Sequence, residues 1–171
     1  MTRSARTALL VVCLGLLLAL PARGQDLNPR FGLGFNTVIS TEDGLGLGLR
    51  LRGSAPVNRD LSFAVDMGVT GFVLEGRDEA TYLVDPQVSA IITLPYGNES
   101  GQLTYFLGGL GAYLPFDGDG VSDSAAPTIH MGIGRVKQLT ETSFFYEINP
   151  ALAIGESSVD LVLPLRVGII F

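Results

Sequence analysis

The chain has 171 residues, of which 47% are hydrophobic and 22 are glycine, and it carries a formal net charge of −6. This length suits one domain, and the acidic balance argues against a nucleic-acid partner, whose phosphates require a basic face. No segment repeats its hydrophobic residues with a helical period over the length that a helix needs, so the sequence disfavours a helical fold.

The first 24 residues have the layout of a secretory signal peptide. Arg3 and Arg6 form a short basic start, Ala8–Leu20 is an unbroken apolar run that Pro21 ends, and Ala22 and Gly24 are the small residues that a signal peptidase inspects. A membrane-spanning helix needs roughly 20 apolar residues, so this run is too short for a permanent anchor. We therefore expect cleavage after Gly24 by a signal peptidase.

This cleavage divides the chain into a signal at 1–24 and one mature domain at 25–171. All 17 acidic residues but only eight of the 11 basic residues belong to the mature domain, whose net charge is therefore −9. The one cysteine, Cys13, lies inside the apolar run of the signal. The mature domain thus has no cysteine with which to form a disulfide or a thiolate metal site, and we predict no cofactor.

Beyond the signal, apolar and polar residues alternate with a period of two in eight segments that polar turns separate. Segments of roughly ten residues with one apolar face are typical of transmembrane β-strands. An even number of strands is what a closed bacterial barrel requires, and closure leaves no unpaired strand edge in the lipid. The predicted strands are Phe31–Ile39, Leu45–Arg52, Leu61–Val73, Tyr82–Leu94, Leu103–Phe116, Thr128–Lys137, Phe144–Ile154 and Leu161–Phe171.

Most of these strands have an obvious apolar face. The second strand, for example, has leucine at every odd position from Leu45 to Leu51. The fifth strand is rich in glycine and ambiguous in phase. The residues that we assign to its outward face are Leu103, Tyr105, Leu107 and Tyr113.

The content of the polar face distinguishes a membrane barrel from a soluble one. A soluble lipocalin-like barrel points its apolar face inward and its polar face to water. Here the polar face holds glycine, serine, alanine and a few charges of both signs, and the chain has one lysine, Lys137. That face suits the crowded inside of a narrow barrel, and the leucine-rich face suits lipid. Aromatic residues near strand ends predict girdles at the membrane surfaces; they are Tyr82, Tyr105, Tyr113, Phe144 and Tyr146.

The last strand ends in alternating apolar residues up to a C-terminal phenylalanine, which are Leu165, Val167, Ile169 and Phe171. This pattern resembles the C-terminal assembly signal of bacterial outer-membrane proteins. The stretch Tyr105–Tyr113 resembles strands of the small outer-membrane β-barrel superfamily. The resemblance implies an all-β fold, a closed antiparallel up-and-down transmembrane β-barrel in the cell outer membrane. It also implies outer-membrane lipids as partners and the barrel-assembly machinery as a partner during biogenesis.

Eight strands enclose a lumen that side chains largely fill, so no wide pore is expected. Inward charges must then pair, because an isolated buried ion is strongly disfavoured. If the chain starts at the periplasm, Arg50 and Asp66 lie at comparable heights on neighbouring strands, and Glu147 and Arg166 match in the same way. We predict these two pairs as structural salt bridges that plug the lumen, in preference to a gate or a proton path.

Two further features give weaker indications of a catalytic or metal site. His130 is the one histidine and faces inward, where a packed polar role is commoner than catalysis. The acidic loop 117–123 offers carboxylates for calcium, but Val121 stands where a third oxygen ligand belongs and no glutamate closes the loop. We therefore predict no catalytic residue and no metal site.

These observations favour a non-enzymatic integral outer-membrane β-barrel with a structural or surface-interaction role and a filled lumen. Three alternatives stay open. The first is a narrow channel or transporter for small solutes, the second a lipid-modifying outer-membrane enzyme, and the third a soluble periplasmic lipocalin-like lipid binder.

Overall fold

The computed structural model describes residues 28–41, 44–72, 81–94, 101–117, 120–121, 125–155 and 159–171. The predicted signal at 1–24 lies outside these residues. Among the described residues, no helix is long and apolar enough to cross a membrane. The strands are β1 Arg30–Ser40, β2 Gly44–Pro56, β3 Leu61–Phe72, β4 Thr81–Leu94, β5 Gln102–Asp117, β6 Gly120–Val121, β7 Ala126–Gln138, β8 Ser143–Ile148, β9 Ala151–Ile154 and β10 Val159–Ile170.

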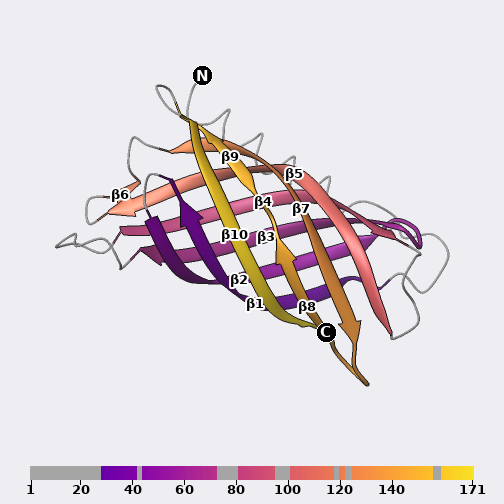
Figure 1. Cartoon of the computed structure of the whole chain (residues 1–171). Coiled ribbons are helices and arrows are strands. Elements are labelled where there is room, and N and C mark those ends of the chain that lie inside the picture. The colour runs from indigo at the N-terminus through magenta and orange to yellow at the C-terminus, as the bar shows by residue number, and fades with distance from the viewer. Residues whose placement is uncertain are drawn as a thin grey trace, which may run out of the picture.

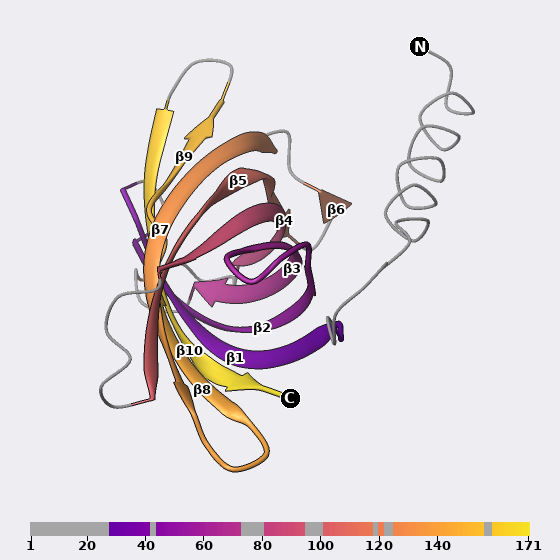
Figure 2. The ribbon, with the colours of Figure 1, turned by 90° about the vertical axis from the view of Figure 1, so that its right-hand side faces the viewer.

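The strands form one closed antiparallel barrel, as the sequence predicted. Each neighbouring pair from β1 to β5 is hydrogen-bonded, β5 pairs with β7, and β10 pairs with β1, which closes the sheet. Figure 1 shows the tilted strands from the side, and Figure 2 shows them curving around a common axis. Because every long strand has a neighbour on both sides, the backbone polar groups have partners within the sheet, which a bilayer demands.

The predicted seventh strand is interrupted by a proline. β8 and β9 lie on either side of Asn149 and Pro150, and both pair with β7 and with β10. Pro150 has no backbone N–H to donate, but the ladder continues around it. The Asn149 N–H donates to the Pro164 carbonyl at 3.1 Å, and the Met131 N–H donates to the Pro150 carbonyl at 3.0 Å. β8 and β9 therefore act as one wall of an eight-stranded barrel, and β6 is a short addition to the edge of β5.

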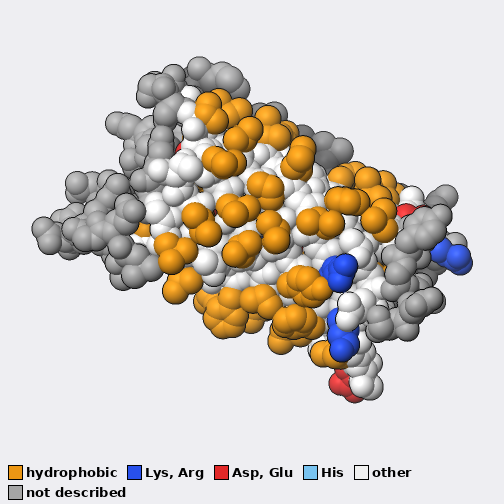
Figure 3. Space-filling model, in the orientation of Figure 1, with side chains coloured by type: hydrophobic (Ala, Val, Ile, Leu, Met, Phe, Trp, Pro, Cys, Tyr) orange, Lys and Arg blue, Asp and Glu red, His pale blue; other side chains and the backbone are white. Residues whose placement is uncertain are grey.

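Leucine, isoleucine, valine, methionine and phenylalanine side chains cover the outside of the barrel (Figure 3). Leu49 in the middle of β2 is 54% exposed and Met131 on β7 is 70% exposed, whereas His130 between its apolar neighbours on β7 is 2% exposed. This alternation confirms the predicted faces of seven strands. A soluble lipocalin-like barrel requires the opposite arrangement, with the apolar face inside.

The predicted phase of the fifth strand is wrong. On β5 the side chains of Tyr105, Leu107 and Tyr113 are buried in the lumen, and Phe106 and Leu110 are exposed on the outside. Leu103 shares the inward face by its position in the strand. The aromatic-girdle prediction therefore fails for Tyr105 and Tyr113, whereas the exposed positions of Tyr82, Phe144 and Tyr146 agree with it.

Different hydrogen bonds join β1 to β10 at the two ends of the barrel. β1 begins and β10 finishes at the same end, where the N–H groups of Phe31 and Phe171 each donate to the other residue's carbonyl at 3.0 and 2.8 Å. We call this the termini end. At the opposite end the seam between β1 and β10 is tied by Asp160, which accepts hydrogen bonds from the Ser40 hydroxyl at 2.7 Å and the Thr41 N–H at 3.0 Å.

Candidate functional site

The inside of the barrel carries the chain's buried polar chemistry. Among the described residues, seven buried side chains in the lumen carry a formal charge, and each is at most 5% exposed. Six of them form one network of opposite charges in equal number, and the seventh, Asp160, binds Ser40 and Thr41 at the seam. The three cations and the three anions are Arg50, Arg52, Arg166, Asp66, Asp85 and Glu147. Their formal charges cancel, so the lumen holds ions that are expensive to bury singly but are paired here.

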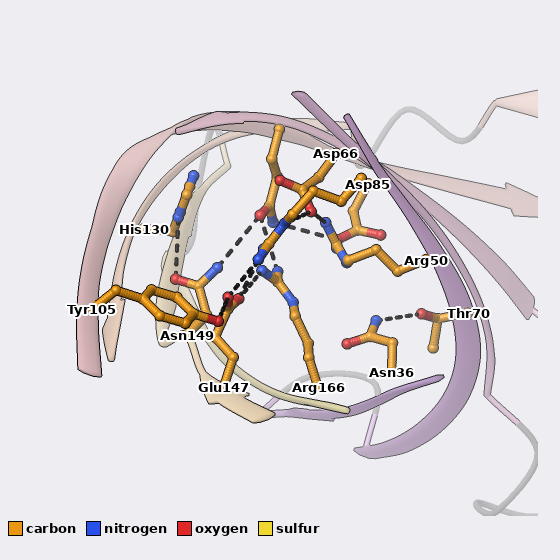
Figure 4. A network of polar contacts seen from close by, with 12 residues as sticks. Asn36, Arg50, Asp66, Thr70, Asp85, Tyr105, His130, Glu147, Asn149 and Arg166 are labelled. Atoms are coloured by element: carbon orange, nitrogen blue, oxygen red, sulfur yellow. Dashed lines mark hydrogen bonds and ion pairs between the residues drawn. The ribbon is translucent and has the colours of Figure 1, made fainter. Parts of the chain in front are cut away.

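Glu147 on β8 is the centre of this network (Figure 4). Its carboxylate accepts hydrogen bonds from Arg52 Nη1 at 2.9 Å and Nη2 at 3.2 Å. It also accepts from Arg166 Nη1 at 2.7 Å and from the Tyr105 hydroxyl at 3.0 Å. Three side chains, from β2, β5 and β10, thus meet at the Glu147 carboxylate, and β1 and β10 separate β2 from β8 along the wall. The contacts therefore cross the lumen.

A second part of the network lies on β2, β3 and β4. Arg52 Nε donates to Asp66 Oδ1 at 2.8 Å, so Arg52 joins Asp66 to Glu147. Arg50 Nη1 lies 3.6 Å from the same Asp66 oxygen, and Arg50 Nη2 donates to Asp85. Arginine suits this role because its planar guanidinium offers five donors in a fixed fork to several acceptors. The result is a continuous chain of ion pairs from Asp85 to Glu147.

Amide side chains extend the network to the remaining wall. The Gln87 Oε1 atom on β4 accepts from Arg166 Nη2 at 2.9 Å and lies 3.5 Å from the Asn149 amide nitrogen. The Asn149 Oδ1 atom lies 3.1 Å from His130 Nδ1. His130 is thus a packed polar residue of the lumen wall, in contact with an amide and remote from the apolar outer surface.

Small residues on the wall provide the space that these large side chains occupy. A Cβ atom on Gly34 or Gly168 would lie 3.2 or 2.7 Å from the ring of Phe145, which is buried in the lumen. The Arg52 guanidinium lies 5.4 Å from the centre of that ring, within the range of a cation–π contact. The glycine-rich inward face is therefore filled by large side chains from neighbouring strands.

An apolar layer lies beyond the charged network, toward the end opposite the termini. Its members are buried and come from six strands, with Phe72 packed against them. They are Val38, Leu83, Tyr113, Ala126, Ala151, Ala153 and Val162. The lumen thus holds an ionic layer and an apolar layer along its axis, and both occupy the path that a solute would take.

The structure brings together both residue pairs that the sequence singled out. Glu147 and Arg166 lie in direct contact, and Arg50 lies near Asp66. The strand register adds what the sequence did not assign, because it places Arg52 directly opposite Asp66 and Arg50 opposite Gly68. As a result Arg50 also pairs with Asp85, and Arg52 connects the two predicted pairs.

Sequence reasoning also missed Tyr105, because it assigned that side chain to the lipid. The available signal was Gly134, which lies beside Tyr105 in the β5–β7 ladder and leaves room for a large neighbour. A Cβ atom on Gly134 would lie 2.3 to 2.8 Å from two ring atoms and the hydroxyl oxygen of Tyr105. Tyr105 therefore depends on the absence of a side chain at Gly134.

Replacing Gly134 with alanine should lower the free energy of unfolding by about 1–3 kcal/mol, the usual penalty for overpacking. The tyrosine ring must move, and its hydroxyl then loses contact with Glu147. Urea unfolding of the protein folded in lipid vesicles measures the change. Gly108→Ala is the matched control on the outward face of β5, since the nearest atom to its Cβ would be the His130 carbonyl oxygen, at an ordinary contact distance of 3.6 Å. Equal stabilities of the two variants would contradict this packing.

No group of three or more histidine, cysteine, aspartate or glutamate residues suited to a metal occurs among the described residues. The loop 117–123, which the sequence raised as a candidate calcium site, has its carboxylate side chains outside the described part of the structure. The carboxylates at the centre of the described lumen, Asp66, Asp85 and Glu147, are bound to arginines.

No protein-family model and no curated protein matches the chain in sequence. Solved structures do match its fold. Neisserial surface protein A has a TM-score of 0.67 and 17% identity, and the match covers 83% of this chain and 94% of that one. The N-terminal β-barrel domain of Pseudomonas aeruginosa OprF has 0.53 and 14%, with 83% and 97% covered. The attachment invasion locus protein Ail of Yersinia pestis has 0.52 and 14%, with 86% and 100% covered. The chain therefore has the fold of small bacterial outer-membrane β-barrels.

Proposed function

We propose that this chain, which has the fold of the small bacterial outer-membrane barrels, is an integral outer-membrane protein with a closed lumen and a non-enzymatic role. That role is structural or consists of interactions at the cell surface. The observation that carries the proposal is the pairing of an apolar exterior with an ionic interior. The apolar exterior is suited to contact with lipid, and the charges in the interior pair with one another.

The filled lumen supports a closed barrel in preference to a channel. Glu147 receives hydrogen bonds from three other walls, and Gln87 on β4 reaches Arg166 on β10 across the lumen. Moving a solute past these groups requires breaking several charge-assisted hydrogen bonds at once, each stronger than a neutral one. The apolar layer around Leu83 and Val162 adds a second barrier.

The position of His130 supports a non-enzymatic role. An enzyme acting on membrane lipids needs its catalytic group where a lipid can reach it, and His130 is 2% exposed on the lumen side of β7. Ser89 on β4 is also inward and buried, with Gly109 between it and His130 in the strand ladder. The lumen encloses both side chains, and the outer surface beside them is apolar.

The alternating C-terminal residues support a partner in biogenesis. Leu165, Val167 and Ile169 are exposed on the outer face of β10, and Phe171 is 63% exposed at its end. A partner that recognises these side chains needs access to them, and on the outer face of the barrel they are accessible. We include this machinery, and the outer-membrane lipids, in the proposal as partners.

Conductance across a planar bilayer tests the closed lumen. The purified protein, whose folded state is verified by its heat-dependent shift on a gel, should give no steady ohmic current after insertion, because paired charges and the apolar layer occupy its axis. A large porin inserted in the same way is the positive control. A steady current proportional to the number of inserted molecules would overturn the closed lumen and favour a narrow channel.

A further inference from the structure

The outer face of the barrel, over the strands that the structure describes, carries charge at one place. Among the outward-facing strand residues that the structure describes, the charged ones are Arg135 and Lys137, both near the end of β7. They are exposed and lie two positions apart, so their side chains point to the same side of the sheet. Neither forms an ion pair within the described part of the chain.

Strand register places polar and aromatic neighbours beside these two cations. Arg135 lies between Thr104 on β5 and Tyr146 on β8. One step toward the termini end, Lys137 lies between Gln102 and Phe144. We call the four residues Thr104, Arg135, Lys137 and Tyr146 the cationic patch.

The cationic patch marks an edge of the apolar surface. The next row toward the barrel centre is wholly apolar, with Phe106, Ile133 and Ile148 side by side. Figure 3 shows Lys and Arg side chains bordering the apolar surface near the end of β7. Hydroxyls and cations thus begin where the hydrocarbon contact stops, which is the depth of lipid headgroups.

We propose that the cationic patch binds the phosphate of an anionic phospholipid in the membrane leaflet at the termini end. Two cations on one face, with the hydroxyls of Thr104 and Tyr146 on either side, offer charge-assisted hydrogen bonds to one phosphate group. The row of Phe106, Ile133 and Ile148 lies where the acyl chains of that lipid would pack. Basic clusters at this depth recognise anionic headgroups by the same chemistry.

This inference rests on the proposed location of the barrel in a membrane. Because a chain exported by an N-terminal signal starts its barrel at the periplasm, the termini end faces the periplasmic leaflet, whose phospholipids are the source of the phosphate. Lipopolysaccharide, in the other leaflet, is the competing source. Insertion in lipid is measured separately, by the shift between unheated and boiled samples on a gel, so a failure of the patch differs from a failure of the barrel.

Native mass spectrometry of the detergent-released protein, exposed to equal amounts of phosphatidylglycerol and phosphatidylcholine, tests the proposal. The wild type should retain phosphatidylglycerol preferentially. The double variant Arg135→Gln/Lys137→Gln should lower that preference on the order of tenfold, from the loss of two interfacial cations. Arg135→Lys/Lys137→Arg should keep it, because both charges remain.

The control variant is Arg30→Gln/Arg59→Gln, which removes two exposed cations at the same end but off the outward strand face. It should retain the wild-type preference. An equal loss in both double variants would overturn the proposal, because net charge alone would then explain binding. Displacement of the phospholipid by lipopolysaccharide or by free glycerol phosphate at equal concentration would overturn it as well, since the site would then have another source of phosphate.

Discussion

Replacing Glu147 with alanine should lower the free energy of unfolding by about 3–5 kcal/mol, the range for breaking a buried ion pair by removing one partner. Arg52 and Arg166 would each lose a carboxylate within 3 Å, and Tyr105 would lose its acceptor. Arg52 would keep Asp66, but Arg166 would stay in the lumen with no carboxylate beside it, and the network would carry one uncompensated positive charge. Urea unfolding in lipid vesicles, followed by circular dichroism, measures the change.

Glu141→Ala is the control for this substitution. Glu141 is exposed in the turn between β7 and β8, where removing a charge changes stability by well under 1 kcal/mol as a rule. Glu147→Gln should fall between the two, because the amide keeps an acceptor oxygen and loses the charge. If Glu147→Ala is as stable as Glu141→Ala, the ion-pair network does not hold the barrel together.

Replacing Leu49 with arginine should destabilise the folded protein by about 2–4 kcal/mol, the penalty for a cation on the lipid face near the bilayer midplane. Leu49 is the outward residue at the middle of β2, between Phe35 on β1 and Val69 on β3. In water the same change would relieve apolar exposure. The sign of the effect therefore reports whether lipid or water surrounds this face.

Val57→Arg provides the comparison for the lipid-face variant. The exposed fraction of Val57, 50%, is close to that of Leu49, 54%, but Val57 lies in the turn after β2 at the termini end. A cation there can reach water and should change stability by less than about 1 kcal/mol. Equal effects of the two substitutions on urea unfolding would remove the distinction between a lipid-facing strand and a turn.

The period of two predicted most of the fold because lipid imposes a simple rule on each strand. An outward residue must be apolar, and a strand such as β2 then shows leucine at alternate positions. The fifth strand breaks the pattern because its small residues occupy both faces, at Gly108 and Gly109. A tyrosine side chain occurs on either face of such a strand. Tyr105 points inward, where its hydroxyl donates to Glu147 on β8, a strand far away in the sequence.

The candidate site was predictable as a set of inward charges but not as a set of contacts. Alternation alone assigns Arg52, Asp85 and Glu147 to the lumen. Which arginine meets which carboxylate depends on the stagger of neighbouring strands around the closed barrel, and a two-residue difference in height separates Arg50 from Arg52. Long side chains also contact partners across the lumen, and the order of the strands in the sequence does not predict the distances between side chains on opposite walls.

Fluorescence quenching by lipid tests the central claim, that the apolar face points into a membrane, most directly. The chain has no tryptophan, so a single introduced tryptophan reports one position. In vesicles whose acyl chains carry bromine, Leu49→Trp should be strongly quenched, and Tyr113→Trp, on the lumen side of β5, should be quenched little. Strong quenching at position 113 with none at position 49 would mean that the barrel presents the other face to lipid, and it would contradict the account.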